Sequence, residues 1–208
     1  MNIIDISWPI SPDMTAYKDR KQVLLTPTKT FEQDHVRESM LQLGCNSGTH
    51  IDAPSHFMRD GVFIDKVSLS TVIGPCTVLD LTHVTFAITA SDLQKQSIDE
   101  GSIVVCKTTN SSLAPTAPFN PHFVYIDASA ARYLVEKNIK AIGIDYLGIE
   151  RNQPDHATHE AFMQAGITII EGLRLQGVQA GNYFLWCLPL ALQGTEAAPA
   201  RAVLVQEK

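Results

Sequence analysis

Three side chains that could bind a metal ion lie close together near residue 50. His50, Asp52 and His56 fall within seven positions of the chain. In an extended backbone alternate side chains share one face, so His50 and Asp52 can point at one site while Ile51 packs on the other side. A glycine in the segment allows a close backbone approach, and Pro54 fixes the chain direction before His56.

Imidazole and carboxylate groups together suit zinc, manganese or iron. A bound divalent ion can lower the pKa of water to about 7, and a further histidine nearby could then act as general base and acid. The alternative is structural, because single histidines and aspartates in loops rich in glycine and proline are usually turn formers or hydrogen-bonded supports. The residue types alone leave both interpretations open.

The whole segment resembles a known signature. Residues 46–56 match six of the seven fixed positions of H-x-G-T-H-x-D-x-P-x-H, the motif of the Putative cyclase superfamily, which includes bacterial kynurenine formamidases and isatin hydrolases. Similarity continues at residues 5–10, at 141–145, and at His159 with residues 171–173. The resemblance implies one metal-dependent hydrolase domain over residues 1–208. It also implies the swivelling β/β/α fold, with a barrel-like core of strands and few short peripheral helices.

The resemblance also implies roles for individual residues. His50 and Asp52 match the family's metal ligands, His56 matches its catalytic acid and base, and His159 and Glu171 match its distal ligands. In the implied reaction a metal-activated water attacks a carbonyl with help from His56, which then protonates the leaving group.

Two patterns in the sequence agree with the distal pair. His159 shares a helical stripe with Phe162 and Met163, so its ring should face inward. Glu171 ends an apolar run, where an acid needs a partner such as a metal unless it caps a turn in water. His156 lies on the same stripe and is a rival ligand, but the spacing of His159 to Glu171 fits the family better.

The first signature position departs from the family, because Asn46 replaces a histidine. An amide oxygen can bind a metal, but it is a weaker, neutral donor. The site could keep one zinc or manganese ion with altered affinity, or it could lose a two-ion arrangement and the usual activity. We favour one ion because the other candidate ligands are present. The alternative is a catalytically impaired protein that only binds a metal or a small molecule.

The expected substrate is a small amide, lactam, lactone or formamide, and it can be aromatic. The loop from Trp8 to Arg20 resembles the family's substrate-contacting loop, and the flat faces of Trp8 and Tyr17 suit such a molecule. Simple packing of the loop is the alternative for both rings. The family's usual Trp/Tyr-Pro-Gly-Asp is here Tyr17-Lys18-Asp19-Arg20, which favours a substrate other than formylkynurenine, with Lys18 or Arg20 meeting a carboxylate.

The four cysteines are far apart and form no C-x-x-C pair, so they predict neither a zinc ribbon nor a thioredoxin-type site. Apolar neighbours favour buried, reduced thiols. Cys45 lies beside the candidate site, and a cysteine hydrolase is therefore a third, weaker hypothesis.

The composition limits the class of protein. A hydrophobic fraction of 45% with 18% charged residues is that of a packed globular chain. The net charge of −6 and the lack of a basic stripe disfavour nucleic acid as a partner. No apolar run is long enough for a membrane span, and a cytoplasmic location is expected. Homodimers or homotetramers are usual in similar proteins.

Short β-branched runs predict most of the elements that must position the site. Strands are expected at residues 3–6, 23–28, 76–81, 103–107, 139–144, 167–170, 183–188 and 202–205. Helices are expected at residues 91–95, at 128–137 after an Asp127 N-cap, and at 156–165 after Asp155. The chain is therefore a mixed α/β protein rich in strands. The loops 9–20 and 108–122 are read as functional or covering loops.

Overall fold

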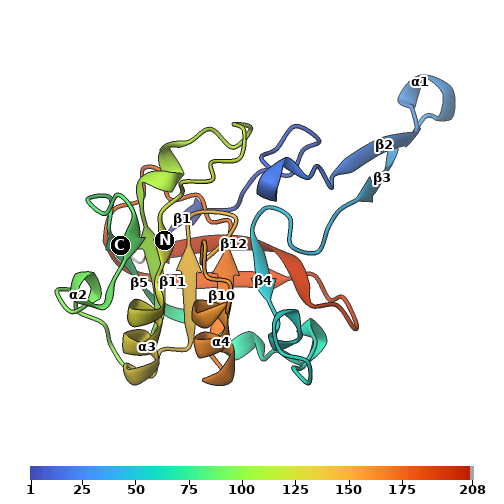
Figure 1. Cartoon of the computed structure of the whole chain (residues 1–208). Helices are drawn as coiled ribbons and strands as arrows, with labels where there is room; N and C mark the ends of the chain where they lie inside the picture. Colours follow the sequence, from blue (N-terminus) through green and yellow to red (C-terminus); the bar gives the residue numbers. More distant parts are fainter. Residues whose placement is uncertain (207–208) are drawn as a thin grey trace.

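Seven strands close into a barrel in the computed structural model, which describes residues 1–206 (Figure 1). The order around the barrel is β12-β11-β5-β7-β9-β10-β4, and β4 also pairs with β12 to close the ring. The barrel strands are β4 (His50–Asp52), β5 (Ile73–Asp80), β7 (Ile103–Lys107), β9 (Ala141–Ile144), β10 (Thr168–Glu171), β11 (Gly181–Pro189) and β12 (Ala197–Gln206). Strand β1 (Asn2–Asp5) pairs with β12 outside the ring.

The remaining elements are short. They are the strands β2 (Leu24–Lys29), β3 (Glu38–Gln42), β6 (Ala87–Ile88) and β8 (Tyr125–Ile126), and the helices α1 (Phe31–Asp34), α2 (Ala90–Leu93), α3 (Ala128–Glu136) and α4 (Ala157–Gln164). Single 3-10 turns are η1 (Tyr17–Asp19), η2 (Pro54–His56), η3 (Ile64–Lys66), η4 (Leu69–Thr71) and η5 (Thr109–Ser112). The strand-rich mixed α/β prediction, with a barrel-like core and few short helices, is confirmed. None of the helices within residues 1–206 has the length and apolar character needed to span a bilayer.

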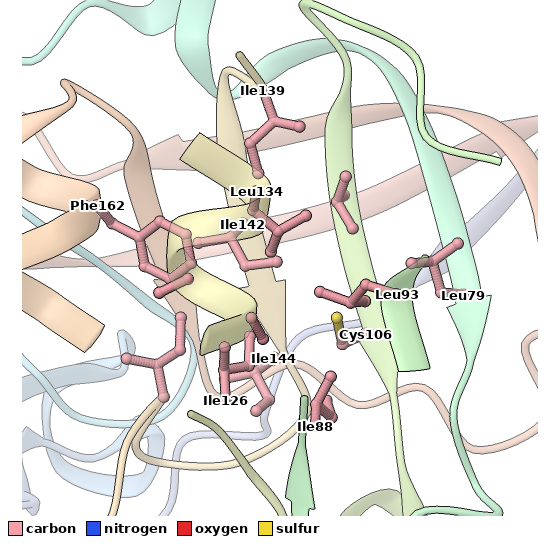
Figure 2. Packing of buried hydrophobic residues seen from close by; sticks show 14 of the residues in the cluster. Leu79, Ile88, Leu93, Cys106, Ile126, Leu134, Ile139, Ile142, Ile144 and Phe162 are labelled. Carbon is pink, nitrogen blue, oxygen red and sulfur yellow. The ribbon is translucent and has the colours of Figure 1, made fainter. Parts of the chain in front are cut away.

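The parallel strands β7, β9 and β10 are buried on both faces. In β7, Ile103 and Val105 pack in the barrel interior, whereas Val104 and Cys106 belong to the layer covered by helices. Figure 2 shows that outer layer, where Leu134 of α3 and Phe162 of α4 lie in one cluster with residues of the sheet. Burial on both faces explains why these strands read as uninterrupted apolar runs.

The eight expected strands all correspond to observed ones, but their ends shift by a few residues. Asp127 caps α3 as expected, since its carboxylate accepts from the backbone N–H groups of Ser129 and Ala130. The helix expected from residue 156 instead begins at Ala157, and Asp155 is not its N-cap. The N-cap is His156, which has a left-handed φ of 51° and no side-chain capping bond.

Four strands were not predicted, namely β3, β4, β6 and β8. Strand β4 has only three residues and β6 and β8 have two each, which is too short for an alternating pattern. Strands β2 and β3 form a hairpin with α1 at its tip, and Figure 1 shows this arm projecting away from the barrel. Every residue of both arm strands is exposed.

Candidate metal centre

Barrel closure places the two halves of the candidate site side by side. Strand β4 lies between β10 and β12, and its antiparallel register pairs His50 with Glu171 and Asp52 with Ile169. Ile51 packs in the barrel interior, so His50 and Asp52 project from the opposite face of β4. Helix α4 adds His159 to the same place, and the four ionisable side chains are buried, with residue exposures of 2–5%.

Each imidazole faces both carboxylates. Nε2 of His50 lies 3.6 Å from Asp52 Oδ1 and 3.4 Å from Glu171 Oε2. Nε2 of His159 lies 3.8 Å from Asp52 Oδ2 and 3.4 Å from Glu171 Oε1. These separations are long for hydrogen bonds. They are close to the roughly 3.3 Å that separates ligand atoms around a tetrahedral ion with bonds of ~2.0–2.1 Å.

The donor set fits a divalent cation. Asp52 Oδ1 is buried without a hydrogen-bond partner among residues 1–206, and burial together with the nearby Glu171 raises the pKa of Asp52. A buried carboxylate oxygen without a hydrogen bond is costly, and a cation bound to it removes that cost. Two imidazole nitrogens and two carboxylates are a donor set that suits zinc or manganese.

The two histidines are held in place by contacts behind the site. Nδ1 of His50 lies 2.9 Å from the carbonyl oxygen of Gly48, and donation of its proton to that oxygen leaves the Nε2 lone pair facing the carboxylates. Burial opposes a charge on His50, but Glu171 and Asp52 outweigh burial and raise its pKa to about 9. Burial likewise opposes a charge on His159, but Glu150, Glu171 and Asp52 raise its pKa to about 10.

Sequence reasoning missed Glu150. This residue is 7% exposed, and its Oε1 lies 2.6 Å from His156 Nδ1 and 2.9 Å from His159 Nδ1. The histidines outweigh the effect of burial and lower the pKa of Glu150. The only sequence signal was an acid that ends the apolar run 146–149. His156 lies with Glu150 and its side chain is 52% exposed, so the structure brings His159 rather than His156 to the other three candidate ligands.

A pocket of about 540 Å³ opens over the site. Residues of the candidate centre, of η2 and of the two long loops line it, among them His50, Glu171, His56, Tyr17 and Phe119. His56 is half-buried, and Tyr17 packs edge-on against Phe119 with ring centroids 5.0 Å apart. The two loops that sequence analysis read as functional or covering loops therefore form part of the pocket wall.

The other candidate residues are spread over different surroundings. Asn46 and Lys18 line the same pocket, and Asn46 is exposed at its edge, whereas Arg20 lines a smaller neighbouring pocket. Burial and the nearby Glu196 raise the pKa of Cys45, which disfavours the thiolate that a cysteine hydrolase needs. The remaining histidines, His35, His83 and His122, are exposed and lie outside the pocket lining.

The substrate hypothesis requires Trp8 to line the pocket, but Trp8 packs behind lining residues such as Phe123 and Leu147. It is 2% exposed and is absent from the pocket lining within residues 1–206. Its Nε1 donates to the carbonyl of Pro115 at 3.0 Å, and its backbone N–H donates to Thr49 Oγ1 at 2.7 Å. The guanidinium of Arg174 lies 4.6 Å from the ring centroid. The packing alternative therefore describes Trp8, which joins the N-terminal loop to the residue before His50.

Fold and donor set together define a β-barrel protein whose buried histidines and carboxylates fit a divalent cation. A family model described as "Putative cyclase" matches residues 4–151. The kynurenine formamidase of Salinibacter ruber is 30% identical over 207 residues, which cover 98% of this chain and 97% of that protein. The chain belongs to the Putative cyclase family, as the signature at residues 46–56 predicts.

Solved structures agree with this assignment. A "predicted metal-dependent hydrolase from Bacillus stearothermophilus" matches with a TM-score of 0.87 and 42% identity, covering 98% of this chain and 97% of its own. An isatin hydrolase bound to the product analogue thioisatinate matches with a TM-score of 0.86, covering 99% and 92%. At 21% identity the second likeness shows a shared fold only.

Proposed function

We propose that this protein is a metal-dependent hydrolase that cleaves the C–N bond of a small amide, lactam or formamide. A lactone is a related candidate substrate. The observation that carries the proposal is the convergence of two histidines and two carboxylates, all buried, beneath a pocket large enough for a small molecule. The similarity to a kynurenine formamidase and to a structure described as a metal-dependent hydrolase supports it.

In this proposal His50, Asp52, His159 and Glu171 hold one zinc or manganese ion. Such an ion, when bound, lowers the pKa of water and polarises a carbonyl group. His56 lines the pocket beside these ligands and is half-buried, so it can exchange protons with a substrate and with solvent. It would accept a proton from the attacking water and return it to the leaving nitrogen.

The aromatic side of the pocket would orient the substrate. Tyr17 and Phe119 present ring surfaces on the side formed by the two long loops, and Phe57 lies next to His56 with ring centroids 4.5 Å apart. Such surfaces suit a flat molecule. Lys18 lines the same pocket and, in this proposal, would meet a carboxylate of the substrate.

Metal analysis followed by hydrolysis assays tests the proposal. The purified protein is loaded with zinc or manganese, its metal content is measured, and turnover of small amides, lactams, lactones, formamides and esters is recorded. His56→Ala should abolish turnover while leaving metal content nearly unchanged, because this residue is not among the four ligands. Unaltered rates in His56→Ala would rule out its role. Stoichiometric metal without turnover of any substrate by the unmodified protein would favour the alternative, an impaired homologue that only binds.

Asn46 favours the one-ion catalyst over that alternative. His50, Asp52 and Glu171 form a compact group without it, and His159 lies within 3.8 Å of both carboxylates. Asn46 is exposed at the edge of the pocket rather than buried with them. Loss of the first signature histidine therefore leaves a complete donor set for one ion.

We further propose that the protein forms a homodimer or homotetramer in the cytoplasm. The arm formed by β2 and β3 supports self-association, because Leu24, Leu25, Met40 and Leu41 are each at least half exposed on it. Cysteines without a disulfide in the structure are compatible with a reducing compartment. Light scattering coupled to size exclusion should give a mass of two or four chains, and a monomer at micromolar concentration would contradict the assembly.

A further inference from the structure

Glu150 contacts both the start of α4 and the imidazole of His159. Its Oε2 accepts from the backbone N–H groups of Thr158 at 3.1 Å and His159 at 3.3 Å, at the start of α4. The N-cap residue of this helix, His156, supplies no side-chain capping bond. The carboxylate of Glu150 therefore takes the place of an N-cap side chain and complements the positive end of the helix.

The second oxygen of Glu150 faces imidazole nitrogens. Oε1 lies 2.9 Å from Nδ1 of His159, whose Nε2 faces Glu171 and Asp52 on the other side of the ring. The N–H direction at Nδ1 is not aligned with a hydrogen bond, and Glu150 is the only acidic side chain within 4.0 Å of this nitrogen among residues 1–206. A buried ring nitrogen beside one carboxylate has a strong preference for orientation.

Phe57 restrains the same ring in a different way. It stacks on His159 with centroids 4.0 Å apart and planes 25° apart, which limits tilting of the imidazole. Stacking does not decide whether Nε2 or Cε1 faces the carboxylates, because rotation by 180° about the Cβ–Cγ bond restores the same ring plane. Glu150 makes that choice, since an acceptor at Nδ1 favours the proton there and leaves the Nε2 lone pair facing Asp52 and Glu171.

We propose that Glu150 is a positioning residue that fixes the orientation and tautomer of His159 for metal binding. The inference rests on the proposed metal site and adds Glu150, which contacts the Nδ1 side of the ligand His159. The separations of 2.6 Å and 2.9 Å from Glu150 Oε1 to the Nδ1 atoms of His156 and His159 are hydrogen-bonding distances. They are shorter than the roughly 3.3 Å between ligands of a tetrahedral ion. The cluster of Glu150, His156 and His159 therefore fits a support for the site better than a second ion.

The test compares zinc dissociation constants, measured by competition with a chromophoric chelator. Glu150→Ala should weaken zinc binding by about 10- to 100-fold, the range for loss of a partner behind a metal ligand. Glu150→Gln keeps the shape and an acceptor oxygen and should recover part of the affinity. Nitrogen-15 NMR of zinc-loaded protein should show the Nδ1-protonated form of His159 in the unmodified chain and a mixture or loss of that signal in Glu150→Ala.

Two control variants separate positioning from helix capping and from a second ion. Gln153→Ala removes hydrogen bonds to Thr158 and to the carbonyl of Ile126, so it loosens the start of α4 without touching the carboxylate. It should lower the melting temperature and leave the zinc dissociation constant within about threefold. His156→Ala should also leave that constant and the stoichiometry unchanged, whereas loss of one bound ion in this variant would overturn the proposal.

The outcomes distinguish the two proposals. Unmodified protein that binds no zinc or manganese would overturn the metal site and the positioning role together. Unmodified protein that binds zinc, with Glu150→Ala binding equally tightly, would overturn the role of Glu150 alone. Weakened binding in Gln153→Ala to the same extent as in Glu150→Ala would show that the helix start, and not the ring contact, sets the affinity.

Discussion

Gly172 lies where the backbone that follows Glu171 approaches the backbone that precedes His50. It follows Glu171 directly and has a φ of +70°, which L side chains rarely adopt. A methyl group built on it would overlap the carbonyl of Gly48 and lie 3.0 Å from the nitrogen of Thr49, just before His50. Gly172→Ala should therefore destabilise the fold and displace β4 from β10 at the candidate ligands.

The size of the effect can be estimated against a matched control. Gly166 has a nearly identical φ of +73° but nothing within 4 Å of a built Cβ. Alanine at either position costs about 1–2 kcal/mol for the left-handed backbone. Only Gly172→Ala adds overpacking against rigid backbone, about 1–3 kcal/mol or more. The expected losses are about 2–5 kcal/mol for Gly172→Ala and about 1–2 kcal/mol for Gly166→Ala.

Thermal unfolding of metal-free protein, followed by circular dichroism, measures the difference. At about 2–4 °C per kcal/mol for a chain of this size, Gly172→Ala should melt some 4–20 °C below the unmodified protein. Gly166→Ala should melt only about 2–8 °C below it. Zinc binding should weaken at least tenfold in Gly172→Ala and remain unchanged in Gly166→Ala. Equal melting temperatures and equal zinc affinities for the two variants would refute the argument from close approach.

Two further predictions concern the ion itself. Because the pKa of His50 is raised to about 9 and that of His159 to about 10, both rings hold an extra proton at pH 7 in the metal-free protein. Zinc must displace these protons, so zinc affinity should rise as the pH increases toward 9 and level off above about 10. Calorimetry in buffers of different ionisation enthalpy should report that zinc binding releases about two protons at pH 7. Asn46→His restores the family signature and should lower the zinc dissociation constant at least ~10-fold or raise the stoichiometry above one. Identical binding by this variant, measured by elemental analysis and chelator competition, would mean that position 46 does not reach the ion.

The sequence predicted the parallel strands well because their environment is the same on both faces. A strand such as β7, packed on the barrel interior and on the helices, must be apolar throughout and is recognised without knowledge of its neighbours. Strand β4 escaped notice because two of its three residues are ionisable. Its membership in the barrel depends on pairing with β10 and β12, which are distant in the chain.

The sequence likewise predicted those parts of the candidate site that local geometry determines, and not those that depend on distant contacts. The alternation of His50, Ile51 and Asp52 follows from local geometry, and the structure places these side chains on opposite faces as expected. The role of Glu150 depends on contacts with a later helix, which no local pattern encodes. The role of Trp8 stayed open between packing and substrate contact for a related reason, because an aromatic residue in a loop gives the same pattern whether it packs inward or faces a ligand.

Pairing of β4 with its neighbours makes barrel closure and assembly of the site one event. A slip of one residue would turn Ile51 toward Glu171 and push His50 and Asp52 into the apolar interior, at the cost of burying two ionisable groups without partners. Thr49 secures the register, since its hydroxyl donates to the carbonyl of Gly172 at 2.5 Å and accepts from the backbone of Trp8. The pairing of β4 with β10 that closes the barrel therefore also sets the distance between the early ligands on β4 and the late ligand Glu171. A change that weakens this pairing should also move the ligands apart.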